Sequence, residues 1–123
     1  MALTVNHPLL KEARVSVATT SIGATPVACY VGIPIRGRIS KISAVDQGAI
    51  TTTDCTVTVA LNGVTNTALG FTIPVAGAAA GRNTSATPTS AVYVSEDDVL
   101  TFTSSGSAGA SIGSVFTVNV QMA

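Results

Sequence analysis

The chain has 123 residues, six of them basic and six acidic, so its formal net charge is zero and only 10% of its residues are charged. An ordinary globular protein is about 25% charged. A nucleic-acid-binding protein needs clustered Lys and Arg to neutralise phosphates, so we expect no nucleic-acid partner. A hydrophobic content of 46% argues against intrinsic disorder. A neutral surface rich in Thr, Ser and Ala favours association, so we expect a homo-oligomer, either a dimer or a trimer.

The first 13 residues differ from the rest of the chain. The stretch from Pro8 to Ala13 has helical character but is too short for a stable helix. The N-terminus lacks the basic region and apolar run of a signal peptide. No apolar run reaches the roughly 18 residues of a membrane span, so no membrane contact is expected. We expect residues 1–13 to form an N-terminal arm and residues 14–123 to form a single β-sandwich domain.

From residue 14 onward, Val, Ile and Thr alternate with polar residues, and turn residues follow at short intervals. This pattern is typical of β-strands. The stretches 77–90 and 105–113 are rich in small residues and are expected to be loops. The expected strands are Arg14–Thr19, Val27–Ile35, Arg38–Val45, Thr53–Leu61, Leu69–Val75, Ala91–Val94, Val99–Ser104 and Ser114–Gln121. About eight short strands predict an all-β fold, namely an antiparallel β-sandwich, a jelly roll or a barrel.

One expected strand has an irregular hydrophobic pattern. Ile39, Ile42 and Val45 are spaced by three, which does not fit the period of two along a strand. A β-bulge near Ser40 and Lys41 would place Ile42 on the same face as Ile39. We therefore predict a bulge at this point.

Turn and core residues can be predicted from the same pattern. Asn62-Gly63 is a strong signal for a tight hairpin. Pro34 indicates that the strand over 27–35 lies at a sheet edge or carries a bulge. Residues that share a parity within their strands are expected to form the core: Val57, Val59, Leu61, Phe71, Ile73, Leu100, Phe102, Phe116 and Val118.

The sequence offers little material for catalysis or metal binding. His7, the single histidine, lies in the N-terminal arm with no Cys, Asp or Glu nearby, so we expect neither a Ser-His-Asp triad nor a Cys-His pair. Cys29 and Cys55 with one His cannot complete a tetrahedral zinc site. We expect both cysteines to be reduced and buried, although a disulfide between adjacent strands is geometrically possible. No catalytic, cofactor-binding or metal-binding residue is expected, and we expect no enzymatic activity.

The acidic residues and the glycine-rich stretch have ordinary explanations. Glu96, Asp97 and Asp98 form the densest charge cluster, which could contribute ligands to calcium or could be a solvated turn. Whether this turn binds a cation stays open. Asp46 and Asp54 are expected to be isolated acids in turns. Residues 106–113 match neither the dinucleotide-binding nor the phosphate-loop pattern, so we expect a surface loop.

Half of the positive charge falls within six residues, at Arg36, Arg38 and Lys41. Arg36 and Arg38 should point the same way on a strand. They could form a small basic stripe that meets an acidic partner surface. Alternatively, they could protect an edge strand against aggregation, since Pro34 and Gly37 suggest an edge.

A longer segment resembles a known family. The run from Ile33 to Val45, its continuation from Gly48 to Asp54, and the Val/Thr strand that ends at Leu61-Asn62-Gly63 are similar to segments of head decoration (cement) proteins of tailed bacteriophages. The acidic turn and strand over 95–102 are similar as well. The resemblance covers residues 27–121. It implies a jelly-roll-like sandwich, oligomers on the outer surface of the phage capsid, synthesis in the host cytoplasm, and no enzymatic activity.

The leading hypothesis is therefore a structural virion protein that binds the major capsid protein and stabilises the phage head. The alternative is a carbohydrate-binding or adhesive β-sandwich module on a phage particle. Exposed aromatic rings favour sugar binding, and Tyr30 and Tyr93 are the candidates. Apart from the basic stripe, the expected partner contacts are the apolar residues of the arm: Leu3, Val5, Leu9 and Leu10.

Overall fold

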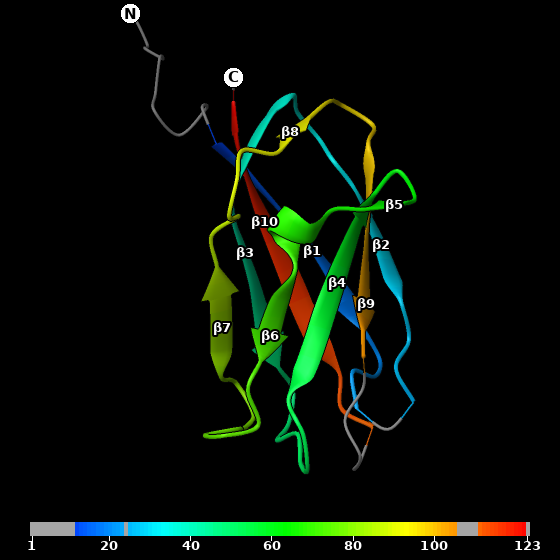
Figure 1. The fold of residues 1–123 in the computed structure, drawn as a ribbon, viewed down its shortest axis with the longest axis vertical. Coiled ribbons are helices and arrows are strands. Elements are labelled where there is room, and N and C mark those ends of the chain that lie inside the picture. Colours follow the sequence, from blue (N-terminus) through cyan, green and yellow to red (C-terminus); the bar gives the residue numbers. More distant parts are fainter. Residues whose placement is uncertain (1–11, 24, 106–110, 123) are drawn as a thin grey trace, which may run out of the picture.

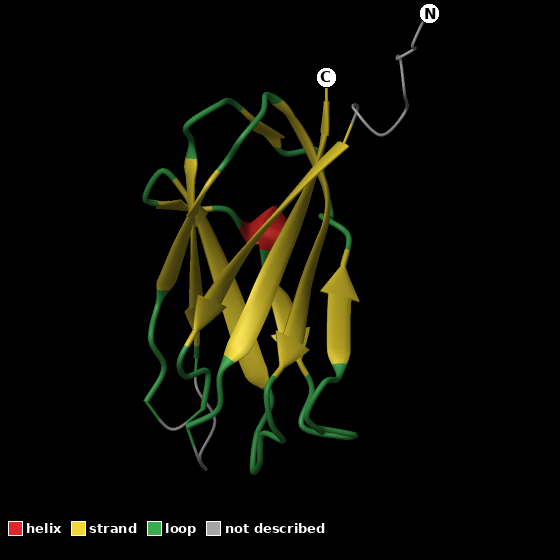
Figure 2. Cartoon of the chain, turned by 180° about the vertical axis from the view of Figure 1, so that it is seen from behind, coloured by secondary structure: helices red, strands yellow, loops and turns green. Residues whose placement is uncertain are grey.

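The computed structural model describes residues 12–23, 25–105 and 111–122, and this part of the chain forms two antiparallel β-sheets. The first sheet has the order β1 (Glu12–Thr19), β10 (Ser114–Met122), β3 (Gly37–Asp46), followed by β7 (Asn83–Ala86) and β8 (Tyr93–Val94), which both pair with β3. The second sheet has the order β2 (Cys29–Gly32), β9 (Val99–Ser104), β4 (Cys55–Leu61), followed by β5 (Val64–Thr65) and β6 (Phe71–Ile73), which both pair with β4. The second sheet lies in front in Figure 1, and the first sheet lies in front in Figure 2.

The strand pairing is that of a jelly roll. β1 pairs with β10 and β2 with β9, β3 pairs with β7 and β8, and β4 pairs with β5 and β6. The chain is therefore one long antiparallel hairpin, folded so that successive pairs alternate between the two sheets. If β5 with β6 and β7 with β8 are each counted as one interrupted strand, the described residues hold the eight strands of a jelly roll. The predicted all-β, jelly-roll-like sandwich is confirmed.

The core lies between the sheets and centres on three phenylalanines. Phe102 of β9 stacks on Phe116 of β10, with ring centroids 4.8 Å apart and an interplanar angle of 3°. Phe71 of β6 meets Phe116 edge to face at 6.3 Å. Eight of the nine predicted core residues are buried, and the exception, Leu61, is partly buried at the end of β4. The alternation of Val and Thr thus predicted the buried face correctly.

The predicted bulge is present in β3. The register between β3 and β10 pairs Lys41 with Asn119 but Ile39 with Val120, so Ser40 is the extra residue. The bulge places Ile39 and Ile42 on the same buried face, where they are 2% and 1% exposed. It also leaves Arg38 and Lys41 exposed together on the outer face.

The predicted hairpin joins β4 to β5. Asn62 and Gly63 both have positive φ, at 51° and 85°, as a type I′ turn requires. β2 ends at Gly32, two residues before Pro34, and it is an edge strand of the second sheet. The edge position that Pro34 indicated is therefore correct for this strand.

Several boundaries differ from expectation. The strands expected over 27–35, 53–61 and 91–94 are shorter, at Cys29–Gly32, Cys55–Leu61 and Tyr93–Val94. The stretch 77–90 is not entirely loop, because Asn83–Ala86 forms β7 against β3; this polar edge strand has no hydrophobic alternation to reveal it. Glu12 and Ala13 belong to β1 rather than to a helical arm, so the sandwich begins two residues before position 14. The strand expected over 69–75 is shortened to β6 by the 3-10 helix η2 (Thr67–Leu69), whose start is capped by the Asn66 side chain.

Candidate functional site

The two sheets differ in charge. Every charged residue in the described strands belongs to the first sheet: Glu12, Arg14, Arg38, Lys41 and Asp46. The strands β2, β4, β5, β6 and β9 of the second sheet contain none. The molecule therefore presents one charged outer face and one neutral outer face, and these suit partners of different chemistry.

The charged face is hollowed around Arg38. The pairing of β1, β10, β3 and β8 aligns Glu12, Gln121, Arg38 and Tyr93 in one row across the first sheet. Arg38 Nη2 donates a hydrogen bond of 3.1 Å to Gln121 Oε1. Arg38, Tyr93, Gln121 and Met122 line a pocket of about 210 Å³. Tyr93 is 68% and Met122 47% exposed, so apolar surface surrounds the guanidinium of Arg38.

The predicted basic stripe is only partly formed. Arg38 and Lys41 share the outer face of β3, but Arg36 lies in the bend that precedes this strand. The edge-protection hypothesis is wrong for Arg38 and Lys41, because β3 lies between β10 and the β7/β8 pair. Gly37 marks a close approach of two strands rather than an edge, since a Cβ there would lie 2.0 Å from the backbone oxygen of Gln121.

The acidic turn between β8 and β9 is held by its own hydrogen bonds. Asp98 Oδ2 accepts from the backbone N–H of Ser95 at 2.7 Å, and Oδ1 accepts from Asn62 Nδ2 at 3.1 Å. These bonds stabilise the carboxylate and lower the pKa of Asp98 below its ordinary value. Across the described residues, no three His, Cys, Asp or Glu side chains are grouped as a metal site requires. The Asp98 carboxylate thus serves to fix the turn against the β4–β5 hairpin.

Asp46 is not the isolated turn acid that the sequence suggested. It ends β3, its side chain is completely buried, and its Oδ2 lies 3.1 Å from Arg82 Nη2. Arg82 also donates to the carbonyl oxygens of Pro74 and Ala76, so it ties the loop after β6 to the end of β3. Burial raises the pKa of Asp46, and the hydrogen bond and charge of Arg82 offset part of this rise. The two residues are 36 positions apart, and no sequence signal connects them.

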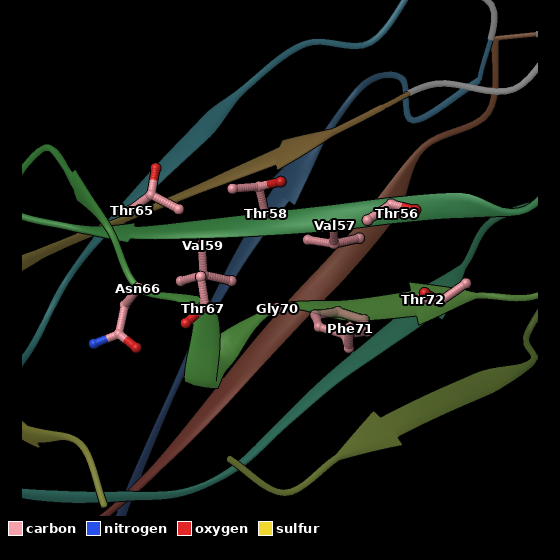
Figure 3. A pocket seen from close by; sticks show the side chains of 10 residues that line it. All are labelled: Thr56, Val57, Thr58, Val59, Thr65, Asn66, Thr67, Gly70, Phe71 and Thr72. Carbon is pink, nitrogen blue, oxygen red and sulfur yellow. The ribbon is translucent and has the colours of Figure 1, made fainter. Parts of the chain in front are cut away.

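The neutral face carries a hollow of its own. A groove of about 310 Å³ opens where the edge of the second sheet is interrupted between β5 and β6 (Figure 3). Gly70 lies at its centre with an ordinary φ of −66°, and a Cβ there would touch nothing closer than 3.4 Å. Neither backbone nor packing therefore demands glycine, and the missing side chain leaves the groove open. Five threonines line it (Figure 3): Thr56, Thr58, Thr65, Thr67 and Thr72.

Both cysteines are free and buried in the second sheet. β9 lies between β2, which carries Cys29, and β4, which carries Cys55, so the two do not lie on adjacent strands. Burial raises the pKa of the Cys29 thiol, and the Cys55 thiol donates to the carbonyl oxygen of Ile22 at 3.1 Å. Both groups therefore serve as core residues.

Some expectations concern residues outside the described part of the chain. The arm residues Leu3, Val5, Leu9 and Leu10, together with His7, lie there. Among the described residues, no helix is long and apolar enough to cross a membrane.

Comparison with known proteins identifies no family for this chain. No model of a protein family matches it, and no curated protein matches it significantly. Among solved structures, its fold is similar to part of the dimeric latent PorU of Porphyromonas gingivalis, with a TM-score of 0.46 and 12% sequence identity. The similarity covers 91% of this chain but only 13% of the PorU chain.

Proposed function

We propose that the protein is a non-enzymatic virion component, a decoration or cement protein that binds the major capsid protein on the outer surface of a phage head. Its synthesis would take place in the host cytoplasm. Jelly rolls are one of the folds of viral capsid domains, and the sequence resembles phage head decoration proteins. Fold alone does not establish function, so the proposal depends on where the binding residues lie.

The observation that carries the proposal is that β1, the strand that follows residues 1–11, starts on the charged face. β1 is an edge strand of the first sheet and starts at Glu12, directly after residues 1–11. Glu12 stands in the same cross-strand row as Gln121 and Arg38. A partner that binds the apolar residues of the arm is therefore within reach of the basic residues as well. The apolar residues are Leu3, Val5, Leu9 and Leu10, and the basic residues are Arg36, Arg38 and Lys41.

The two parts of this surface contribute differently to binding. If residues 1–11 were bound in an extended conformation, they would span about 36–40 Å, enough to cross onto a neighbouring subunit. Ordering such an arm costs conformational entropy, so many copies acting on one multivalent head would supply the affinity. The basic residues add an attraction to acidic capsid surface that weakens as salt is raised.

The experiment is a binding titration on phage heads stripped of the protein. Deleting residues 2–11 leaves β1 intact and should lower occupancy strongly. Lys41→Glu should weaken binding and flatten its salt dependence, whereas the control Thr58→Glu, which adds negative charge on the neutral face, should not. A truncated protein that folds and saturates heads with unchanged affinity would refute the role of the arm. Failure of the native protein to copurify with heads in stoichiometric amounts would refute the function itself.

The neutral face favours a second candidate function, recognition of an uncharged glycan. The groove at Gly70 offers several hydroxyl groups above a floor formed by Val57, Val59 and Phe71. Tyr30 is 65% exposed on the same face, in one row with Thr101, Ala60 and Thr65. Strands are spaced about 4.8 Å apart, so this row spans the length of a short oligosaccharide.

Glycan binding is tested by retention on immobilised neutral polysaccharides. Gly70→Val, which fills the groove, and Tyr30→Ala should abolish retention. Tyr93→Ala, which removes an equally exposed tyrosine from the opposite sheet, is the control, and this variant should still be retained on the polysaccharide. Two results would reject this candidate function. The Gly70→Val variant could still be retained, or the native protein could be retained on none of the polysaccharides.

A further inference from the structure

The pocket beside Arg38 has the chemistry of a carboxylate-binding site. The guanidinium of Arg38 makes one hydrogen bond, to Gln121, and none of the ion pairs among the described residues involves it. Tyr93 and Met122 form apolar walls beside it. A planar guanidinium presents donors that match a carboxylate, and neighbouring apolar groups reduce its contact with water.

The same corner of the molecule presents two exposed carboxylates. Glu96 and Asp97 follow β8 after Ser95, and neither takes part in an ion pair within the part of the chain that the structure describes. The turn that carries them is held by hydrogen bonds. Asp98 accepts hydrogen bonds from Ser95 and Asn62, and the backbone N–H of Asp97 donates to the carbonyl oxygen of Ile33 at 3.0 Å.

The pocket and the acidic turn lie at the same end of the sandwich (Figure 1). Tyr93, which lines the pocket, pairs with Arg38, and Glu96 is three residues further along the chain. Figure 1 shows β8 and the end of β10 at the same end of the sandwich. A surface that holds both partners of a complementary contact side by side suits a two-fold axis, because each copy then supplies both halves.

We infer that this corner is a homodimer interface, in which Glu96 of each copy enters the Arg38 pocket of the other. Two equivalent charge-assisted contacts form about the axis, and Tyr93 and Met122 of both copies leave water. A single exposed ion pair contributes little, so the doubled contact and the apolar walls together determine the affinity. The occupant is a second copy because the complementary charge is present on this chain, next to the pocket. The inference deepens the expectation of a homo-oligomer and does not depend on binding to a capsid. In the dimer Glu96 occupies Arg38, so Arg36 and Lys41 supply the attraction to the capsid.

Charge reversal provides a specific test, read by sedimentation equilibrium at low salt. The native protein should be a dimer. Arg38→Glu and Glu96→Arg should each raise the dimer dissociation constant by at least about tenfold, because each places like charges opposite one another. The double variant Arg38→Glu/Glu96→Arg should dimerise again, and an equimolar mixture of the two single variants should form heterodimers. Arg14→Glu, the same charge reversal on β1 and outside the pocket, is the matched control and should leave dimerisation unchanged.

Each outcome bears on the inference directly. A native monomer, single variants that remain dimeric, or a double variant that stays monomeric would overturn it, provided that circular dichroism shows all variants folded. Titration on stripped heads separates this result from the proposed function. If the charge-swapped double variant dimerises but does not bind heads, the dimer interface is supported and the defect lies in capsid binding.

Discussion

The carboxylate of Asp46 and the guanidinium of Arg82 form a buried ion pair, with Oδ2 and Nη2 3.1 Å apart and side chains 0% and 19% exposed. Two backbone hydrogen bonds reinforce this contact. The N–H of Asp46 donates to the carbonyl oxygen of Arg82, and the N–H of Gly81 donates to the carbonyl oxygen of Asp46. β3 and the segment that enters β7 are thereby joined at the end of the sandwich opposite the Arg38 pocket. The polar edge strand β7 therefore does not depend on hydrophobic burial alone.

Removing the guanidinium should destabilise the fold strongly. Arg82→Met leaves the Asp46 carboxylate buried without its cation, and breaking a buried pair from one side costs about 3–5 kcal/mol. Urea denaturation monitored by circular dichroism measures this loss. Arg36→Met is the matched control, because Arg36 is exposed, and its effect should stay within about 0.5 kcal/mol. Equal effects of the two substitutions would show that the Asp46–Arg82 pair contributes nothing.

The second prediction concerns the stacked rings that join the sheets. Phe102→Ala removes the partner that stacks on Phe116 and leaves a cavity at a site only 1% exposed. We expect the free energy of unfolding to fall by about 3–5 kcal/mol. Thr103→Ala, at the next and exposed position of β9, should change it by no more than about 0.5 kcal/mol. A small effect of Phe102→Ala in denaturant titrations would contradict the described core.

Features that depend on neighbouring residues could be predicted from the sequence, and features that depend on distant pairing could not. Alternation placed Phe102 and Phe116 in the core, and the spacing of Ile39 and Ile42 predicted the bulge. β7 escaped prediction because it is a strand only by virtue of pairing with β3.

The candidate site was harder to predict for the same reason. The pocket beside Arg38 combines residues from β3, β8 and β10, so the basic residues were visible in the sequence while Tyr93 and Met122 beside them were not. The groove at Gly70 exists because an edge strand is interrupted, and no local pattern marks that interruption. Both hollows follow from topology rather than from a motif.

The third prediction is a pH dependence that arises from Asp98. Hydrogen bonds from Ser95 and Asn62 lower its pKa in the folded protein below the ordinary value of 3.8. The unfolded chain therefore binds the proton more tightly, so the stabilisation is present above pH 3.8 and is lost as the pH falls below it. Asp98→Asn should remove this part of the pH dependence. Urea titrations of both proteins at pH 5 and pH 2.5 should thus show a smaller acid-induced loss for the variant, and an equal loss would exclude a role for Asp98.

The last prediction compares three glycines that differ in what a side chain would meet. Gly63 has a φ of +85° and open space around it, so Gly63→Ala should cost about 1–2 kcal/mol through backbone strain alone. Gly32 has neither positive φ nor a neighbour within 4 Å, so Gly32→Ala, the control, should cause no loss of stability.

Gly37→Ala should be the most damaging, because its Cβ would lie 2.0 Å from the backbone oxygen of Gln121 and would push β3 away from β10. That displacement would also open the pocket that Gln121 and Arg38 line, so Gly37→Ala should weaken dimerisation at temperatures where the variant is still folded. Thermal unfolding gives the order of the three effects, and a Gly37→Ala variant as stable as Gly32→Ala would contradict the close approach of these two strands.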